Sequence, residues 1–204
     1  MPDTSAITKI VGVAGLPRSG KDTLAELFVE NGYYGVSLGD IVRDASRIRH
    51  ADSPDPISVA NMTETSNWLR GEKGADFALK EAFERFDKST GEGNSYKGLI
   101  VWSIRAPAEV DFILDHNGQL IWLESSDNKR LERAQRDRRP GEPEWTLENL
   151  KAQEALQWVP QPNIPEESQM NISYVKSKAT LVYSNDSDSI DAFKEDAKKL
   201  VKSL

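Results

Sequence analysis

"IVGVAGLPRSGKDTLAELF", residues 10–28, is the stretch that decides the fold expected of this chain. Its centre nearly fits the spacing G-x-x-x-x-G-K-[ST], in which a glycine-rich turn and the first amides of a helix surround a phosphate. Gly15, Gly20 and Lys21 fit that spacing, but Asp22 follows the lysine and Thr23 comes one position late. The stretch therefore raises the question of whether an acid in this position spoils a phosphate site or belongs to a variant of one.

The residues on both sides of the turn have the order strand, turn, helix that a phosphate site needs. Residues 9–14 are rich in Val and Ile, which predicts a short buried strand, and residues 21–30 have helical spacing of apolar side chains. The start of such a helix attracts an anion, and Lys21 is long enough to reach the outer phosphates of a nucleotide. The residues expected to contact the nucleotide are Gly15, Arg18, Ser19, Gly20, Lys21, Asp22 and Thr23.

Strands and helices alternate along the rest of the chain. Further short strands are predicted over residues 34–38, 99–104, 119–125 and 180–185, with helices over 39–50, 108–116 and 190–204. Strands joined by helices form right-handed parallel crossovers, so we expect an α/β protein with a five-stranded parallel sheet. The length of 204 residues suits a single domain, 1–204.

Two connections are longer than a crossover requires. One runs from residue 40 to 97 and the other from 127 to 178, and both look mostly helical. Ligands of open α/β sheets bind at the carboxyl ends of the strands. We therefore expect the first excursion to bind an acceptor and the second to act as a lid. Within the second, "WVPQPNIPEESQ", residues 158–169, is predicted to be a proline-broken loop.

The composition restricts the possible functions. The net charge of −7 argues against a general nucleic-acid surface, and no apolar run is long enough to span a bilayer. The absence of cysteine excludes thiolate chemistry, and two histidines make a histidine-rich metal site unexpected. The N-terminus lacks the apolar core of a signal peptide. We expect a cytoplasmic monomer or homodimer with no membrane or nucleic-acid partner.

"GLPRSGKDT", residues 15–23, resembles the phosphate loop of nucleoside monophosphate kinases, and its run RSGKDT is similar to one in phage deoxynucleoside monophosphate kinases. In these families a threonine two positions after the lysine is normal. The resemblance implies a three-layer P-loop NTPase fold in which Thr23 contacts phosphate or the shell of a Mg²⁺ ion. Two roles remain for Asp22. It helps to hold metal-bound water, or it stabilises the start of the helix through the dipole.

"VSLGDIVRD", residues 36–44, resembles a segment of adenylate kinases and the stretch after the second strand of dephospho-CoA kinases. The resemblance implies that Asp40 orients or deprotonates the acceptor and that Arg43 binds its phosphate. Alternatively, Asp40 is a helix N-cap and Arg43 a surface residue. Further along, "NWLRGEKGADFA", residues 67–78, resembles an archaeal family of predicted nucleotide kinases, which implies an acceptor contact from Arg70.

"IVWSIRAPAEV", residues 100–110, resembles the same archaeal family, whose pattern here is Ile-Asp-Gly-Ile-Arg. Arg105 matches the arginine that binds the acceptor. Trp102 stands where the family has an aspartate that orders magnesium-bound water. Either another acid, Asp22 or Asp40, supplies that contact, or metal-dependent transfer is weak.

"NKRLERAQRDRRPGE", residues 128–142, is the most basic part of an otherwise acidic chain. Phosphoryl transfer needs cations around the transferred group, and the archaeal family has a comparable arginine pattern. We therefore expect a lid with Arg130 at the nucleotide and Arg133 at the reacting phosphate, followed by Arg136, Arg138 and Arg139. The alternative is a solvated helix with internal ion pairs. Residues 178–204 resemble the closing strand, turn and helix of dephospho-CoA kinases, which implies that Asn185 lies near the adenine pocket.

Together these patterns predict an ATP- and Mg²⁺-dependent phosphotransferase of the nucleotide-kinase type. Its expected acceptor is a small molecule, a nucleoside monophosphate or a deoxynucleotide. The expected catalytic residues are Lys21, Asp40, Arg105 and Arg133, with Thr23 and Asp22 at the metal. The alternatives are a dephospho-CoA kinase-like enzyme and a nucleotide-binding module with little or no transfer. Trp102 favours the module, whereas the arginines expected at the acceptor favour an enzyme.

Overall fold

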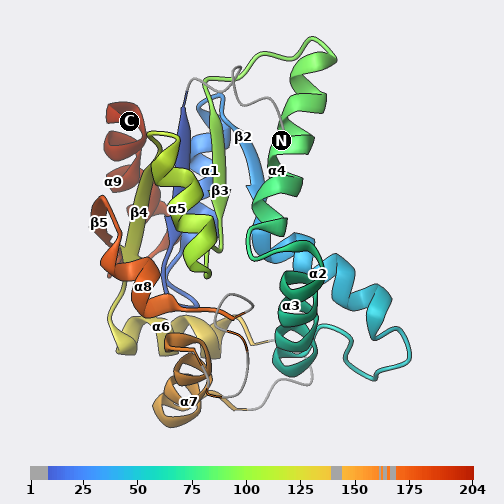
Figure 1. Cartoon of the computed structure of the whole chain (residues 1–204). Coiled ribbons are helices and arrows are strands. Elements are labelled where there is room, and N and C mark those ends of the chain that lie inside the picture. The colour runs from blue at the N-terminus through green and yellow to red at the C-terminus, as the bar shows by residue number, and fades with distance from the viewer. Residues whose placement is uncertain (1–8, 139–143, 161, 163–164, 166–168) are drawn as a thin grey trace.

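The centre of the computed structural model is a five-stranded sheet (Figure 1). Residues 9–138, 144–160, 162, 165 and 169–204 are described. The strands are β1 (Ile10–Ala14), β2 (Tyr34–Ser37), β3 (Leu99–Trp102), β4 (Gln119–Glu124) and β5 (Leu181–Ser184). They lie in the order β2-β3-β1-β4-β5, and every neighbouring pair is parallel. The predicted five-stranded parallel sheet is therefore confirmed.

Helices cover both faces of the sheet and complete the three layers expected of a P-loop NTPase (Figure 1). On one face lie α1 (Lys21–Glu30) and α9 (Ile190–Ser203); on the other lie α4 (Phe77–Gly91), α5 (Pro107–Asp115) and α8 (Ile172–Ser177). A Cβ at Gly12 would lie 2.6 Å from Cδ1 of Ile104 and 2.9 Å from Cδ1 of Ile113. Glycine in β1 therefore lets the chain around α5 approach the central strand closely.

The two long excursions are helical where the structure describes them. The first contains α2 (Leu38–Arg49), α3 (Val59–Lys73) and α4, and the second contains α6 (Asp127–Arg136), α7 (Leu147–Trp158) and α8. Of these helices, α4 and α8 pack against one face of the sheet. The other four, α2, α3, α6 and α7, lie around the carboxyl ends of the strands (Figure 1). Figure 1 shows α3 on one side of this edge and α6 and α7 on the other.

Local backbone geometry sets element ends that the sequence predicted differently. The third strand ends at Trp102 because Ser103 has φ 67°, a left-handed conformation that interrupts an extended strand. The second strand ends at Ser37, whose hydroxyl accepts from the amide of Asp40 at 3.1 Å and caps α2. The alternative in which Asp40 is itself the N-cap is therefore wrong. The described residues between α7 and α8 form no helix or strand, which confirms a break in the proline-containing segment. Over the described ranges, no helix has the length and apolar character needed to cross a membrane.

Candidate active site

The loop between β1 and α1 contains positive φ angles that glycine adopts more easily than other residues. Gly15 has φ 152° and Gly20 has φ 100°, both in the region that disfavours side chains, and Arg18 has φ 63°. A Cβ at Gly15 would lie 2.4 Å from the carbonyl oxygen of Leu123. The glycine spacing read from the sequence therefore corresponds to a tight loop pressed against the end of β4.

Ser19 and Lys21 are polar residues that are buried in this loop with few hydrogen-bond partners. The Oγ atom of Ser19 forms no hydrogen bond within the described residues. Lys21 is 7% exposed, and its Nζ donates to the carbonyl oxygen of Leu16 at 2.8 Å. Burial, and next to it the positive charge of Arg105, lowers the pKa of Lys21 from 10.5 to about 7. An anion in the loop would supply both a partner and the missing negative charge.

Asp22 makes a contact that local sequence did not indicate. It lies in the first turn of α1, where the N-cap residue, Gly20, makes no side-chain capping bond. The Oδ1 atom of Asp22 accepts a hydrogen bond from Nε1 of Trp102 at 2.8 Å. The replacement of the expected acid by tryptophan therefore coincides with a direct contact between that tryptophan and the acid of the loop.

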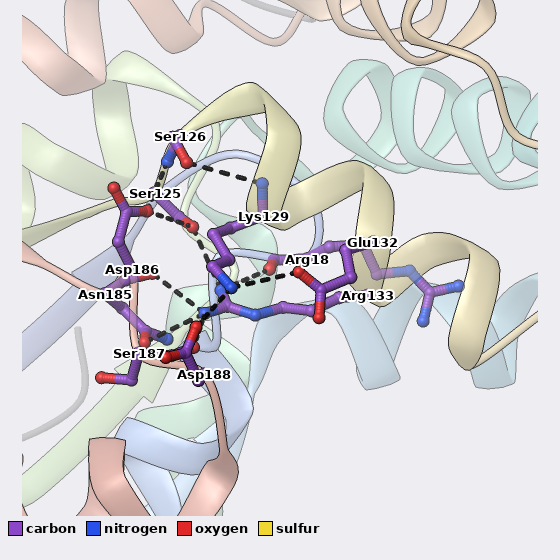
Figure 2. A network of polar contacts seen from close by, with 10 residues as sticks. All are labelled: Arg18, Ser125, Ser126, Lys129, Glu132, Arg133, Asn185, Asp186, Ser187 and Asp188. Atoms are coloured by element: carbon purple, nitrogen blue, oxygen red, sulfur yellow. Dashed lines mark hydrogen bonds and ion pairs between the residues drawn. The ribbon is translucent and has the colours of Figure 1, made fainter.

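Arg133 of α6 ties the loop to the turn after β5 (Figure 2). Its Nη1 donates to the carbonyl oxygen of Arg18 at 3.2 Å and to Oγ of Ser125 at 3.1 Å. Its Nη2 donates to the carbonyl oxygen of Asn185 at 3.0 Å and to that of Ser187 at 3.2 Å. Since both terminal nitrogens are engaged with protein oxygens, Arg133 shapes the loop in this conformation.

Asn185 closes the same network from the other side. Its Nδ2 donates to the carbonyl oxygen of Ser19 at 2.8 Å, and its Oδ1 accepts from Arg133 at 3.1 Å. The side chain of Asp186 accepts from the amide of Ser126 at 2.7 Å, which together with other hydrogen bonds lowers its pKa. The turn after β5 is thus fixed against both the loop and α6.

A cavity of about 190 Å³, here called the smaller cavity, opens between the loop, α6 and the turn after β5. The residues around it include Gly20, Lys21, Asp22, Thr23, Lys129, Arg133, Arg136, Asn185, Ser189 and Phe193. Lys129 closes one side through ion pairs with Asp188 at 2.6 Å and Glu132 at 3.1 Å (Figure 2). Of the residues predicted to contact the nucleotide, Arg18, Gly20, Lys21, Asp22, Thr23 and Asn185 therefore meet at this cavity, whereas Gly15, Ser19 and Arg130 do not line it.

A second cavity of about 320 Å³, here called the larger cavity, lies between α2, α3 and α7. Among the residues around it are Ser37, Arg43, Met62, Ser66, Arg70, Arg105, Glu109, Trp145, Gln153, Gln157 and Met170. Arg18, Lys21 and Asp22 line both cavities. The two spaces therefore meet at the lysine of the loop, with the first excursion and the second excursion on opposite sides.

Arg70 is buried at the wall of the larger cavity and is only partly paired. It is 5% exposed, and its Nη2 lies 3.9 Å from Oε1 of Glu109. Its Nε and Nη1 have no hydrogen-bond partner among the described residues. Burial lowers the pKa of Arg70 and outweighs the opposing effect of Glu109. A buried guanidinium with two donors that have no partner, in a residue that lines a cavity, is suited to an anion.

Arg105 is held by residues that sequence reasoning missed. Its Nη1 donates to Oε1 of Gln157 at 2.5 Å and lies 3.9 Å from Sδ of Met170. Its carbonyl oxygen accepts from the amide of Asn171 at 2.8 Å. Gln157 of α7 and the two residues just before α8, Met170 and Asn171, thus lie against Arg105, and no local signal in the sequence pointed to them.

Glu109 links the two buried arginines and was also missed. It is 2% exposed, and its Oε2 accepts from the amides of Arg105 at 2.8 Å and Ala106 at 3.0 Å at the start of α5. An acid at the third helical position is a common N-terminal signal, so this contact could have been found from the sequence.

Asp40 and Arg43 form an ion pair one helical turn apart in α2. Arg43 lines the larger cavity, whereas Asp40 does not belong to its wall. The structure therefore brings Arg43, Arg70 and Arg105 to one cavity and leaves the predicted acceptor base outside it.

Arg130 is the most deeply buried charge of the second excursion. It is 1% exposed and pairs with Glu154 of α7 and, at 2.6 Å, with Asp127 of α6. Its role in this conformation is to join the two helices. Arg136 pairs with the neighbouring Asp137 at 2.9 Å on the surface, and Arg139 lies outside the described residues. Internal ion pairs, the alternative interpretation of the basic run, are therefore present in part of it.

The residues present fit a Mg²⁺ ion that is held mainly by a nucleotide. Among the described residues, no cluster of three or more His, Asp or Glu side chains is placed to hold a metal. Mg²⁺ usually keeps water and phosphate ligands and needs only one or two protein oxygens. Thr23 and Asp22, next to Lys21 in the wall of the smaller cavity, provide such oxygens.

Comparisons with known proteins agree with this architecture. Residues 11–155 match the family described as AAA domain. A UPF0200 protein from Aeropyrum pernix is 30% identical over 145 residues, 70% of this chain and 72% of that protein. A UPF0200 protein from Pyrobaculum aerophilum is 31% identical over 126 residues, and the match spans 63% of its length, slightly less than two thirds. The crystal structure of TT1252 from Thermus thermophilus aligns over 96% of this chain and 98% of that chain with a TM-score of 0.51 at 17% identity, which is evidence for the fold alone.

Proposed function

We propose that this chain is an ATP-dependent phosphotransferase of the nucleotide-kinase type. The chain belongs to the AAA domain family and to the UPF0200 family of archaeal proteins. The proposed acceptor is a nucleoside monophosphate or deoxynucleotide. The observation that carries the proposal is the pair of cavities that meet at Lys21, one bounded by the phosphate loop and the other by a buried arginine with unused donors.

On the donor side, we assign the triphosphate to the loop and the nucleoside to the smaller cavity. The ammonium of Lys21 lines the smaller cavity, and the buried hydroxyl of Ser19, between Arg18 and Gly20 of the same loop, has no hydrogen-bond partner among the described residues. Binding of a phosphate would favour the charged form of Lys21, whose pKa is about 7. Thr23 and Asp22 would hold Mg²⁺, which when bound neutralises charge on the phosphates. Arg133 and Asn185 keep the loop in the shape that permits this.

On the acceptor side, we assign the phosphate of the mononucleotide to the arginines of the larger cavity. A phosphate monoester carries roughly 1.5 to 2 negative charges at pH 7, and Arg70 has two donors available for it. Arg105 and Arg43 line the same wall. Asp40 and Glu109 offset part of this positive charge. A phosphate would also satisfy the two donors of Arg70 that have no partner among the described residues, which supports a phosphate-bearing acceptor over a neutral one.

The proposed transfer forms one bond and breaks one. An oxygen of the acceptor phosphate bonds to the γ-phosphorus of ATP, the bond from that phosphorus to the β,γ-bridging oxygen breaks, and its electron pair leaves with ADP. Since the acceptor oxygen is already ionised, no base is required. Asp40 pairs with Arg43 and does not itself line the cavity. This position of Asp40 supports the reaction above over transfer to a hydroxyl of a dephospho-CoA-like acceptor, which would need a base. Asp40 would then serve to position Arg43.

The test is a coupled ADP-release screen with Mg²⁺ and ATP over ribo- and deoxyribonucleoside monophosphates and dephospho-CoA. We expect release that depends on a mononucleotide, that is lost in Lys21→Ala, and that Arg70→Met greatly reduces without weakening ATP binding. Release with dephospho-CoA alone would identify the alternative enzyme. Slow release that no acceptor stimulates would identify a nucleotide-binding module instead.

A further inference from the structure

Trp102 and Asp22 join two elements that are far apart in the sequence. Trp102 is the last residue of β3 and lies in register with Val13 of β1 and Ser37 of β2. Asp22 lies in the first turn of α1, and the hydrogen bond from Nε1 to Oδ1 is 2.8 Å long. Ser103, directly after the tryptophan, has φ 67°, so the chain turns away at the point where the indole contacts the loop. The hydrogen bond therefore fixes the indole next to the first turn of α1, directly after the phosphate loop.

The carboxylate of Asp22 is surrounded by cations but is not neutralised by one. Asp22 lines both cavities, together with Arg18 and Lys21, while Arg43 and Arg105 line the larger one. Its Oδ1 accepts a hydrogen bond from the neutral indole, which leaves the charge of the carboxylate in place at the junction of the two cavities.

A neutral donor suits this position better than a second acid would. A carboxylate at residue 102 within hydrogen-bond distance of Asp22 would place two like charges together and favour protonation of one of them. Indole has one N–H donor and no charge. It can fix the orientation of the carboxylate while leaving its charge unchanged.

We propose that Trp102 is a positioning residue for Asp22, and that the carboxylate so oriented serves the divalent cation of a bound metal–nucleotide complex. This inference rests on the proposed function, because it requires nucleotide in the loop. It gives a role to the tryptophan at the end of the third strand, where the resemblance implied an aspartate. The acidic group is supplied by the helix start, and the strand end supplies the donor that holds it.

The experiment measures binding of AMP-PNP, a non-hydrolysable ATP analogue, to the full chain by calorimetry with Mg²⁺ and with EDTA. The readout is the factor by which Mg²⁺ strengthens binding. We expect Trp102→Phe, which keeps an aromatic ring but loses the donor, to reduce that factor about tenfold and to change binding in EDTA by less than about twofold. Asp22→Asn should reduce the factor at least as much. The double variant should equal Asp22→Asn alone, because the donor acts only through the carboxylate.

The chain offers a matched control for the loss of an indole N–H. Trp122 lies in β4 on the other side of β1, in register with Ala14, and its Nε1 has no partner among the described residues. Trp122→Phe should therefore leave the Mg²⁺ factor unchanged. Trp102→His keeps a ring N–H and should retain more of the Mg²⁺ factor than Trp102→Phe. The histidine variant also provides a test if the phenylalanine variant folds poorly.

Two results would overturn the inference and are distinct from failure of the proposed function. Equal weakening by Trp102→Phe with Mg²⁺ and with EDTA would mean that the indole only supports the loop. Additive losses in the double variant would mean that it acts without Asp22. If the wild-type chain binds no AMP-PNP under either condition, the proposed function itself is wrong.

Discussion

Replacement of Arg70 by methionine should separate binding from stability, because the two depend on this residue in opposite ways. Methionine fills a similar volume without charge. Nε and Nη1 of Arg70 are buried without partners, and each unsatisfied group costs about 1–3 kcal/mol. Against this stands the attraction to Glu109 at 3.9 Å, which is about 4 kcal/mol for an effective dielectric constant of about 20.

The direction of the pKa shift agrees with burial being the larger effect. Burial lowers the pKa of Arg70 even though Glu109 raises it, so the charged form is disfavoured in the folded chain on balance. Glu109 also keeps its two backbone donors after the substitution. We expect Arg70→Met to increase the free energy of unfolding by about 1 kcal/mol, which raises Tm by about 2–4 °C for a chain of this size.

The assay is urea and thermal unfolding, with and without inorganic phosphate as the anion. Phosphate should raise the Tm of the wild type more than that of Arg70→Met, in which the phosphate loop is the remaining anion site, and the acceptor KM should rise about 100-fold as two charge-assisted hydrogen bonds are lost. Arg85→Met is the control, because Arg85 forms an exposed pair with Glu81 at 2.9 Å and should change stability by less than about 0.5 kcal/mol. Destabilisation of Arg70→Met by about 3 kcal/mol or more, with the phosphate response intact, would refute the reasoning and make Arg70–Glu109 a structural pair.

Three further predictions follow from the contacts around the loop. Because burial lowers the pKa of Lys21 to about 7, the side chain is mostly neutral at pH 8. Nucleotide binding at that pH should take up close to one proton and weaken as the pH rises, and calorimetry in buffers of different ionisation enthalpy should find no such uptake in Lys21→Met. Gln157→Leu removes the acceptor that holds Nη1 of Arg105, so steady-state kinetics should find the KM of the phosphate acceptor raised about tenfold with the KM of ATP nearly unchanged; an equal change in both would mean that α7 closes over ATP instead. Arg133→Met removes the hydrogen bonds between the loop and the turn after β5, so unfolding should require about 2–3 kcal/mol less free energy and nucleotide binding should weaken. The control Arg47→Met should alter neither quantity, because Arg47 forms an exposed pair with Asp44 and lines neither cavity.

The fold could be predicted because its determinants are local. A run of β-branched residues, a glycine turn and a helix with apolar spacing are each complete within about ten residues, and their alternation fixes a parallel sheet. The errors lie at element ends, where single residues decide. Ser37 rather than Asp40 caps α2, and the left-handed Ser103 ends β3.

The positions of the site residues were easier to predict than their contacts. The sequence placed Lys21, Arg43, Arg70 and Arg105 in motifs, and the structure brings them around cavities that meet. Which atoms they contact depends on residues from distant parts of the chain. Gln157 lies 52 residues from Arg105 in the sequence, and Trp102 lies 80 residues from Asp22. No periodicity or spacing rule reaches across such separations.

The distribution of unsatisfied polar atoms connects the fold to the proposed chemistry. Most buried polar groups in a folded protein have hydrogen-bond partners, and leaving one without a partner is costly. In the described part of the chain, the exceptions include Ser19 in the phosphate loop, Arg70 at the larger cavity and Nε of Arg130 between α6 and α7. Of these residues, Arg70 lines the larger cavity, and Ser19 lies between Arg18 and Gly20, which line the smaller one. Asn67, Trp122 and Arg130 line neither cavity. Ser19 and Arg70 thus adjoin or line the space in which phosphate oxygens would bind. The folded chain therefore keeps unpaired polar groups where an anion would bind, and these groups lower its stability while no anion is bound. Since a ligand that binds only the folded chain stabilises it by mass action, nucleotide and acceptor should each raise Tm, and their combined effect should be largest when both cavities are filled.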